Sequence, residues 1–569
     1  MHKNSSKSYS SGTSTTPLLG LTIGDLFDQI VDQFPDQEAL IVRHQKRRYT
    51  YRQFQVVVNE CARGLLKLGI QKGDRVGIWS QNNAEWATLQ YATAKIGAIL
   101  VNINPSYRLH ELEYALKQSG CRVLVFAPHF KTSNYTQMVC ELIPELHTSA
   151  PGKLDVSTFP HLKILISLEP EPVTGLMGWS DLATLAQAIS PEELASRQGQ
   201  LEFDDPINIQ YTSGTTGFPK GATLSHHNIL NNGYFVGEGM KFTERDRLVI
   251  PVPLYHCFGM VLGNLACLTH GAAAIYPSEG FDPRAVLETV EAERATALHG
   301  VPTMFISELE HPDFSNYDLR SLRTGLMAGA PCPIELMKKV TTLMHMHEFE
   351  IAYGMTETSP VSFQTRTDTP PEKRISTVGQ ILPHVEAKII DPETGQVVPI
   401  GHPGELCTRG YNVMLGYWND PETTHLSIDQ ARWMHTGDLA VMDSEGFVNI
   451  VGRIKDMIIR GGEKISPREV EEFFHTHPKI RDVQIIGVPD QRYGEEVMAW
   501  VHLRDGETAT PEELQEFCRG QIAHQKIPRY FKFVEHFPMT VTGKIQKFQM
   551  RKQSIMELGL ESVETIKTA

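Results

Sequence analysis

One ten-residue stretch, residues 212–221, constrains this chain more than any other. It reads Thr-Ser-Gly-Thr-Thr-Gly-Phe-Pro-Lys-Gly and so holds three glycines, four hydroxyl side chains and one lysine. The backbone N–H groups of such a loop can face a polyphosphate together with the hydroxyls and the ammonium group. The apolar run Ile207–Tyr211 before it predicts a strand, and Ser225 after it is a candidate helix N-cap. We therefore expect a phosphate-binding loop between a strand and a helix.

The spacing within the loop excludes a Walker P-loop. That motif needs Gly-Lys followed directly by Ser or Thr, whereas Lys220 lies between Pro219 and Gly221. A polar surface turn is the alternative, since Ser, Thr and Gly are ordinary loop residues. The density of hydrogen-bond donors favours a nucleotide site.

Length and charge narrow the class of protein. A chain of 569 residues exceeds what one core usually supports, so we expect at least two domains. The net charge of -14, from 67 acidic and 53 basic residues, gives a nucleic-acid partner no electrostatic support. The eight cysteines include no C-x-x-C pair, which indicates a reducing compartment and predicts a cytoplasmic protein.

Two segments raise the question of membranes and targeting. Leu254–Tyr276 carries no Asp, Glu, Lys or Arg, but Asn264 and three glycines interrupt it, so it predicts a buried helix followed by the strand Ala272–Tyr276 and no transmembrane segment. Met1–Thr16 is rich in Ser and Thr and has no acidic residue, which makes a mitochondrial matrix location the alternative. It lacks arginine, so we expect a disordered tail over residues 1–20.

The remaining chain alternates between strand and helix patterns. This alternation predicts an α/β fold with parallel sheets covered by helices. We expect a large N-terminal domain of doubly wound sheets over residues 21–453, with a β-rich subdomain around Val378–Ile390 and Gly404–Thr408. A small, mobile C-terminal α/β domain is expected over residues 454–569. The predicted strands include Arg75–Trp79, Ala98–Ile103, Arg122–Phe126, Arg247–Ile250, Thr296–Leu298, Leu322–Met327, Val483–Val488, Val497–Leu503 and Tyr530–Val534; the predicted helices include Ala84–Lys95, His110–Lys117, Pro283–Glu293 and Pro511–His524.

Four further stretches carry residues suited to nucleotide chemistry. Tyr353-Gly354-Met355-Thr356-Glu357 combines an aromatic ring and a glycine, which suit a stacked base, with a carboxylate that suits Mg²⁺. Asp438 follows a tight turn and can accept hydrogen bonds from both ribose hydroxyls, although a turn cap explains it equally well. Arg453 offers a planar fork for ribose or phosphate oxygens. Lys544 follows a glycine and can project into a cleft, although a lone lysine there is ordinarily solvated.

Together, in this order, the five stretches resemble those of the adenylate-forming superfamily, which includes acyl-CoA synthetases, luciferases and the adenylation domains of peptide synthetases. The resemblance spans nearly the whole chain from about residue 20. The amino-acid sequence is most similar to medium-chain acyl-CoA synthetases of the acyl-CoA synthetase family member 2 type in four segments: Tyr211–Asn228, Leu254–Cys257, Gly410–Trp418 and Asp456–Glu463.

The resemblance implies specific roles for residues of this chain. Catalytic roles fall to Lys544, Glu357, Thr212 and His256, and Glu357 is the implied Mg²⁺ ligand. His256 and Phe258 are the implied border of the acyl pocket, although a satisfied core histidine explains His256 equally well. The implied ATP and AMP contacts are Thr212, Ser213, Gly214, Thr215, Thr216, Gly217, Lys220, Gly329, Ala330, Tyr353, Gly354, Met355, Thr356, Asp438, Arg453 and Lys544.

Two further roles concern movement and the second substrate. Lys455 is the implied hinge of the small domain, with a surface salt bridge as the alternative. Gly461, Gly462 and Glu463 are the implied border of a channel for coenzyme A.

The implied activity is an ATP-dependent, Mg²⁺-dependent ligation of a carboxylic acid, a medium-chain fatty acid, to coenzyme A through an acyl-adenylate. The alternatives are another adenylate-forming enzyme, an aryl-CoA ligase or a luciferase-like oxygenase, and a non-catalytic nucleotide-binding protein. A homodimer stays open as the assembly.

Overall fold

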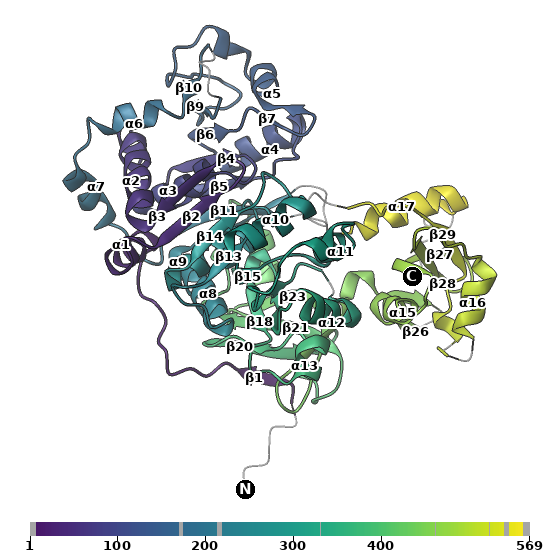
Figure 1. The fold of residues 1–569 in the computed structure, drawn as a ribbon. Helices are drawn as coiled ribbons and strands as arrows, with labels where there is room; N and C mark the ends of the chain where they lie inside the picture. The colour runs from purple at the N-terminus through teal and green to yellow at the C-terminus, as the bar shows by residue number, and fades with distance from the viewer. Residues whose placement is uncertain are drawn as a thin grey trace. The chain divides into compact units, whose positions relative to one another are not determined.

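The computed structural model describes residues 7–169, 174–212, 219–330, 332–460, 463–519, 521–522, 524–539 and 545–561 (Figure 1). The chain forms two compact units. The large unit consists of Ser10–Ala387 and Thr408–Met434; the small unit consists of Met1–Tyr9, Lys388–Cys407 and His435–Ala569. The expected division into residues 21–453 and 454–569 stays a prediction.

The first sheet of the large unit has eight strands in the order β10-β9-β6-β4-β5-β11-β12-β22. The strands from β10 to β11 are parallel, and β12 and β22 are added antiparallel. Their bounds are β4 Arg75–Trp79, β5 Ile99–Ile103, β6 Val123–Phe126, β9 Ile164–Ser167, β10 Met177–Gly178, β11 Pro206–Thr212, β12 Lys220–Ser225 and β22 Gly416–Tyr417.

The second sheet has nine strands in the order β19-β18-β17-β16-β15-β13-β14-β2-β3. Its central strands, from β17 to β2, are parallel, and its outer strands are antiparallel. Two sheets of this kind confirm the predicted doubly wound α/β architecture. The strands of this second sheet are β2 Glu38–Val42, β3 Arg47–Thr50, β13 Arg247–Val249, β14 Ala273–Tyr276, β15 Ala297–Leu298, β16 Thr324–Met327, β17 Glu348–Gly354, β18 Val361–Gln364 and β19 Gln380–Ile381.

Capping residues set where the helices of the large unit begin. Thr50 and Ser225 each form a capping box, and they start α2 (Tyr51–Lys67) and α8 (His226–Gly239). α3 (Ala84–Ile96) is buried along its whole length, as expected of a helix covered on all sides. The other helices are α1 Ile23–Gln33, α4 Leu109–Ser119, α5 Tyr135–Leu142, α6 Asp181–Ala186, α7 Pro191–Gln198, α9 Ala266–His270, α10 Pro283–Glu293, α11 Pro302–Leu309, α12 Ile334–Leu343, α13 Pro371–Ser376 and α14 Pro421–Ser427, with short turns η1 Pro144–His147 and η3 Phe314–Asn316 and a hairpin of β7 His129–Phe130 and β8 Ser133–Asn134.

A third sheet has the order β1-β20-β21-β23-β24 and corresponds to the predicted β-rich subdomain. Strands β23 and β24 form an antiparallel hairpin. The bounds are β1 Tyr9–Ser11, β20 Val385–Ile390, β21 Gly404–Gly410, β23 Met434–Met442 and β24 Val448–Arg453.

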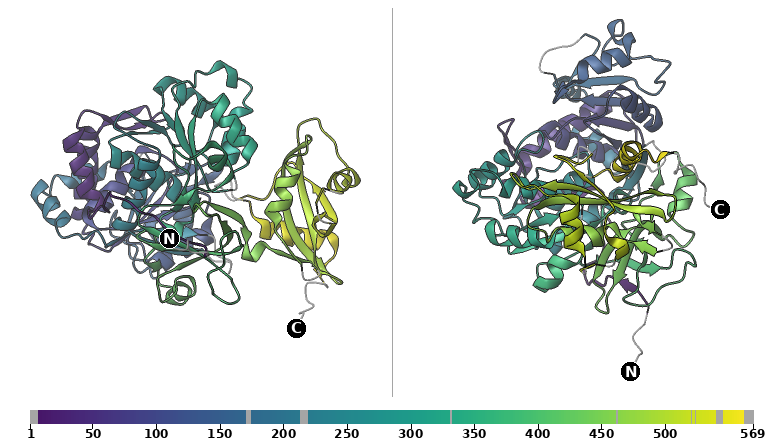
Figure 2. Two further views of the ribbon diagram at one scale, coloured as in Figure 1. Left: turned by 90° about the horizontal axis from the view of Figure 1, so that it is seen from below. Right: turned by 90° about the vertical axis from the view of Figure 1, so that its right-hand side faces the viewer.

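The C-terminal part of the small unit is a compact α/β module (Figure 2). Its sheet has the order β26-β25-β28-β27, and β29 pairs with β28. The expected helix Pro511–His524 is shorter than predicted, because α16 ends at Cys518. The bounds are β25 Ile458–Arg460, β26 Glu463–Ile465, α15 Pro467–Phe474, β27 Ile480–Asp490, β28 Gly494–Leu503, α16 Pro511–Cys518, η6 His524–Lys526, β29 Tyr530–Phe533 and α17 Lys547–Leu558.

The N-terminal segment corrects one expectation. Disorder was expected over residues 1–20, but residues 7–20 are ordered, because their backbone groups find partners. The N–H group of Ser8 donates to the Val398 carbonyl at 2.8 Å, and that of Gly12 donates to Val385 at 2.8 Å. The Leu19 N–H group donates to Asn231 Oδ1 at 2.7 Å. Residues 1–6 lie outside the described part of the chain.

The uncharged segment Leu254–Tyr276 forms a helical stretch, η2 (Phe258–Leu265) followed by α9, and then strand β14. This confirms the interpretation as buried helix and strand. Of the helices in the described ranges, none has both the length and the hydropathy needed to cross a bilayer.

Candidate active site

The two ends of the stretch 212–221 belong to a pair of antiparallel strands. β11 ends at Thr212 and β12 begins at Lys220, and these two residues are direct partners in the antiparallel register. The predicted strand before the loop is confirmed. Ser225 is confirmed as the N-cap of α8, which begins at His226, but residues 220–225 form the unexpected strand β12 between the loop and this helix. Both faces of β12 are buried, so its sequence lacks the alternation that marks a strand. The implied phosphate contacts Ser213, Gly214, Thr215, Thr216 and Gly217 lie outside the described residues.

A buried carboxylate lies beside these two strands. Glu357, on the short turn η4 (Thr356–Thr358), is 6% exposed. Its Oε1 accepts a hydrogen bond from Tyr417 Oη at 2.8 Å and a longer one from Thr212 Oγ1 at 3.4 Å. The Lys220 ammonium lies 5.5 Å from the centroid of the Tyr417 ring. Glu357, Thr212 and Lys220, which carry implied roles in one site, thus lie close together, and Tyr417 joins them.

Tyr417 was missed by the sequence analysis. It lies on β22, which pairs with β12 so that Tyr417 is opposite Ala222. Burial, followed by the negative charge of Glu357, raises the pKa of the Tyr417 hydroxyl, so it stays a donor at neutral pH. One signal was available in the sequence: the segment Gly410–Trp418 resembles the corresponding segment of the family. None of its residues, however, belongs to a recognisable ligand-binding motif.

Glu357 fits the role of a Mg²⁺ ligand. Among the described residues, both hydrogen bonds to its carboxylate end on Oε1, which leaves Oε2 to coordinate a cation. A carboxylate oxygen is the ligand that Mg²⁺ prefers.

The implied adenine contacts gather at one edge of the second sheet. β16 and β17 are parallel neighbours, with Met327 opposite Ile351, so the residues that follow them share the carboxyl edge where nucleotides commonly bind in such sheets. Gly329 and Ala330 follow β16 and are exposed, and Gly329 has a φ of +85°. Tyr353 and Gly354 end β17, with Met355 and Thr356 directly after. A Cβ on Gly354 would lie 1.8 Å from the Pro360 carbonyl oxygen, so only glycine fits there.

The implied acyl-pocket residues adjoin a rare helix type. Phe258 begins η2, a π-helix, which is often found at functional sites. His256 is half-buried, and its ring lies 4.6 Å from that of Tyr255. The Phe258 ring lies 5.5 Å from His299, a fully buried residue that the sequence analysis missed.

His299 ties the π-helix to the second sheet. Its Nδ1 accepts from the Leu326 N–H group at 3.2 Å, so Nε2 carries the proton and donates to the Leu262 carbonyl at 3.0 Å. Burial lowers the pKa of His299 to about 4, so the ring is neutral at physiological pH.

A second group of predicted residues lies on the β23–β24 hairpin. Asp438 and Arg453 are partners in the register, and Arg453 Nε lies 3.0 Å from Asp438 Oδ1. Lys455 is exposed on the 3-10 turn η5 (Ile454–Asp456). Glu463 lies in β26, and its side chain is outside the described part; Gly461, Gly462 and Lys544 also lie outside it.

Comparison with known proteins agrees with this geometry. The family model described as "AMP-binding enzyme" matches residues 27–418, and the model for the C-terminal domain of AMP-binding enzymes matches residues 469–544. The chain is 50% identical over 545 residues to the putative acyl-CoA synthetase YngI of Bacillus subtilis, covering 96% of this chain and 99% of the relative. It is 46% identical over 557 residues to the mitochondrial medium-chain acyl-CoA ligase ACSF2 of Bos taurus, covering 97% and 91%.

Solved structures show the same fold. The ATP-bound MatB of Rhodopseudomonas palustris matches with a TM-score of 0.80 at 28% identity, covering 94% of this chain and 99% of that one. The anthranilate CoA ligase AuaEII in complex with anthranoyl-AMP matches with a TM-score of 0.81 at 26% identity, covering 96% and 99%. With both family models matched, this chain belongs to the family of AMP-binding enzymes.

Proposed function

We propose that this protein is an AMP-forming acid–thiol ligase that joins a medium-chain fatty acid to coenzyme A at the expense of ATP. The observation that carries the proposal is the buried Glu357 carboxylate. It accepts hydrogen bonds from Tyr417 and from Thr212, the last residue of β11. The proposal is supported by the high identity to relatives named as an acyl-CoA synthetase and a medium-chain acyl-CoA ligase.

The chemistry requires activation before acyl transfer, because a carboxylate is a poor electrophile. In the first half-reaction a carboxylate oxygen bonds to the α-phosphorus of ATP, and the bond from that phosphorus to the bridging oxygen breaks, which releases pyrophosphate. Negative charge then spreads over the phosphate oxygens. We assign its stabilisation to Lys544, to Lys220 and to the donors of residues 212–217. Glu357 would hold Mg²⁺, which neutralises phosphate charge when bound.

In the second half-reaction the coenzyme A sulfur attacks the acyl carbon of the adenylate. The thioester forms, the bond to the phosphate oxygen breaks, and AMP leaves with the electron pair. No covalent protein nucleophile is needed. We assign the ribose contacts to Asp438 and Arg453 and the thiol path to the region of Gly461, Gly462 and Glu463.

The acid class follows from the surroundings of His256. Residues 258–265, Phe-Gly-Met-Val-Leu-Gly-Asn-Leu, carry no charge, and all except Phe258 are buried. An uncharged, apolar run of this kind beside His256 favours an aliphatic or aromatic acid over a polar amino acid. The eight cysteines, all among the described residues, are thiols, in keeping with the expected reducing compartment.

Pyrophosphate release tests the proposal. The full chain is given ATP, Mg²⁺, coenzyme A and straight-chain fatty acids of increasing length, with benzoate as the aryl comparison, and acyl-CoA is measured by mass spectrometry. We expect both products, with a maximum at medium chain length. Absence of pyrophosphate with every acid would refute the ligase proposal. Pyrophosphate without acyl-CoA would favour the luciferase-like alternative, and a preference for benzoate would favour an aryl-CoA ligase.

A further inference from the structure

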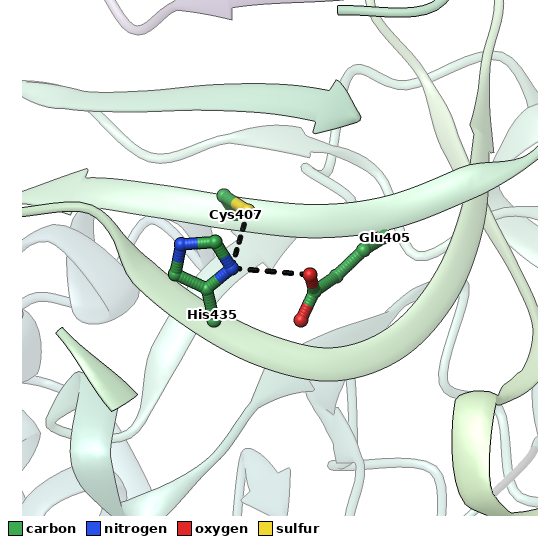
Figure 3. A group of neighbouring side chains, drawn as sticks. All are labelled: Glu405, Cys407 and His435. Atoms are coloured by element: carbon green, nitrogen blue, oxygen red, sulfur yellow. Dashed lines mark hydrogen bonds and ion pairs between the residues drawn. The ribbon is translucent and has the colours of Figure 1, made fainter. Parts of the chain in front are cut away.

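Three side chains with metal-binding groups meet on one face of the third sheet. Glu405 and Cys407 are two residues apart on β21, so both point to the same side, and His435 lies on the neighbouring strand β23 (Figure 3). Their ligand atoms all lie within 4.8 Å of one another. None of the three has a role in the proposed ligase chemistry.

The distances between these atoms match a metal site. His435 Nδ1 lies 3.6 Å from Cys407 Sγ and 3.1 Å from Glu405 Oε2. A tetrahedral Zn²⁺ with ordinary bond lengths places a sulfur and an imidazole nitrogen about 3.6 Å apart, and a nitrogen and a carboxylate oxygen about 3.3 Å apart. Two of the three ligand–ligand distances thus match a tetrahedral site, and the third, between Cys407 Sγ and the Glu405 carboxylate, is within 4.8 Å.

The surroundings hold the three ligands in place. Glu405 Oε1 accepts a hydrogen bond from the Gly437 N–H group at 3.2 Å, which turns Oε2 toward His435. Cys407 is fully buried, whereas the His435 side chain is 30% exposed, so a cation can enter from the imidazole side. Outer hydrogen bonds that orient the ligands in this way are typical of built metal sites.

The cluster is linked to the predicted ribose-binding acid. Thr436, next to His435, donates through Oγ1 to the Leu406 carbonyl at 2.7 Å, between the two β21 ligands. The same Oγ1 accepts from the Asp438 N–H group at 3.1 Å. A change in the spacing of β21 and β23 at the cluster is therefore passed to the backbone of Asp438.

We propose that Glu405, Cys407 and His435 form a binding site for Zn²⁺ or a chemically similar divalent cation, with a fourth position open to water, and that its occupation alters nucleotide affinity through Asp438. Binding forms the Zn–S bond and releases the thiol proton of Cys407 to solvent. The mixed sulfur, nitrogen and oxygen set selects borderline metals, whereas Glu357, with oxygen alone, selects Mg²⁺.

Cobalt(II) absorption tests the metal site directly, because a thiolate bound to Co²⁺ gives a charge-transfer band in the near ultraviolet. The full chain, stripped of metal and kept reduced, is titrated with Co²⁺ and then with Zn²⁺. We expect a band that saturates at one equivalent and is abolished by Zn²⁺. Absence of the band in the folded wild-type protein would overturn the proposal.

Substitutions assign the band to this cluster. Cys407→Ser should abolish it, and Glu405→Gln, which keeps the thiol, should weaken Co²⁺ binding about tenfold or more. Cys140→Ser removes a half-buried thiol elsewhere, on α5, and should leave the band unchanged. If Cys407→Ser keeps the band, or if Cys140→Ser loses it, the site is elsewhere. Thermal melting confirms that each variant is folded, and Glu405→Gln remains decisive if Cys407→Ser is not.

The coupling is measured with AMP, which needs no Mg²⁺; this part rests on the proposed function. We expect the Kd of AMP to change about fivefold or more with Zn²⁺ in the wild type and not in Cys407→Ser. An unchanged Kd would overturn the coupling. A chain that gives the cobalt band but binds no AMP would contradict the proposed function and leave the metal site standing.

Discussion

At the scale of single residues, the position of Glu357 depends on a tyrosine far along the chain. Glu357 is buried, and a buried carboxylate is stable only when its oxygens are hydrogen-bonded. Of the two side-chain hydrogen bonds that it accepts from described residues, Tyr417 Oη supplies the shorter. The same ring lies beside Lys220, so one side chain orders both the implied metal ligand and the lysine of the loop.

Tyr417→Phe is therefore expected to lower the rate of adenylate formation about tenfold or more, since a hydrogen bond to a charged group contributes about 1.5–3 kcal/mol. The aromatic ring and its packing stay, so the chain should fold normally. The measurement is pyrophosphate release as a function of Mg²⁺ concentration, and the Mg²⁺ requirement should rise. Tyr317→Phe, which removes a hydroxyl from a ring between α11 and β16, serves as the control. Equal rates in both variants would show that Tyr417 does not position Glu357.

Single residues also show where sequence reasoning succeeds and fails. The nucleotide-binding roles of Asp438 and Arg453 stay predictions, and the structure adds that the hairpin register makes the two residues partners. Tyr417 and His299 could not be predicted, because their importance comes from neighbours that are distant in sequence. A tyrosine on a short edge strand and a histidine at a strand end look ordinary until the sheet order is known.

At the scale of elements, the strands and helices with strong local signals were predictable. Arg75–Trp79 and Pro283–Glu293 match the observed β4 and α10 residue for residue, and Ser225 caps α8 as expected. The return strand β12 was not predictable, because it is buried on both faces and its residues do not alternate. The π-helix η2 was not predictable either, since an uncharged run does not reveal the helix type.

His299, the buried neutral residue that connects η2 to the second sheet, predicts a pH dependence of the free energy of unfolding. The folded-state pKa of His299 is about 4, below the ordinary value of 6.5, so the unfolded chain binds the proton more readily. The contribution of His299 to the stability of the folded state is therefore fully present above pH 6.5 and is lost as the pH is lowered toward 4. The loss from His299 alone is about 3 kcal/mol.

Urea unfolding at a series of pH values measures this effect. His299→Gln should be less stable than the wild type at neutral pH, because it cannot reproduce both hydrogen bonds, but its stability should fall less steeply between pH 6.5 and 4. The exposed His161→Gln is the control and should follow the wild-type profile. A His299→Gln profile parallel to that of the wild type would contradict a buried, neutral His299.

At the scale of the whole molecule, the doubly wound architecture followed from the alternation of patterns and the family from the order of five motifs. The order of the N-terminal segment could not be predicted, because residues 7–20 have a disorder-prone composition and are ordered by distant partners such as Asn231. The resemblance also assigns motifs from opposite ends of the chain to one reaction, and this assignment stays a prediction. It leads to two predictions about the half-reactions.

Lys544→Ala should nearly abolish adenylate formation, because the lysine is assigned to the charge that develops on the phosphate. Conversion of a supplied acyl-adenylate to the thioester should be largely retained. The two half-reactions are measured separately, by pyrophosphate release and by acyl-CoA formation. Lys552→Ala, at an exposed position on α17, is the control for loss of one positive charge. Equal losses in both half-reactions would refute this division of roles.

Lys455→Pro tests whether the enzyme alternates between two conformations. Proline fixes φ and removes the N–H group at the implied hinge, whereas Lys455→Ala removes the same side chain and leaves the backbone free. We expect the proline variant to keep adenylate formation and to lose thioester formation about tenfold or more, because only the second half-reaction requires the small domain to move. The alanine variant should stay within about twofold of the wild type in both, since an exposed lysine contributes little. If both variants lose thioester formation equally, the reaction uses the side chain of residue 455 and not its backbone freedom; if neither loses it, residue 455 is not the hinge.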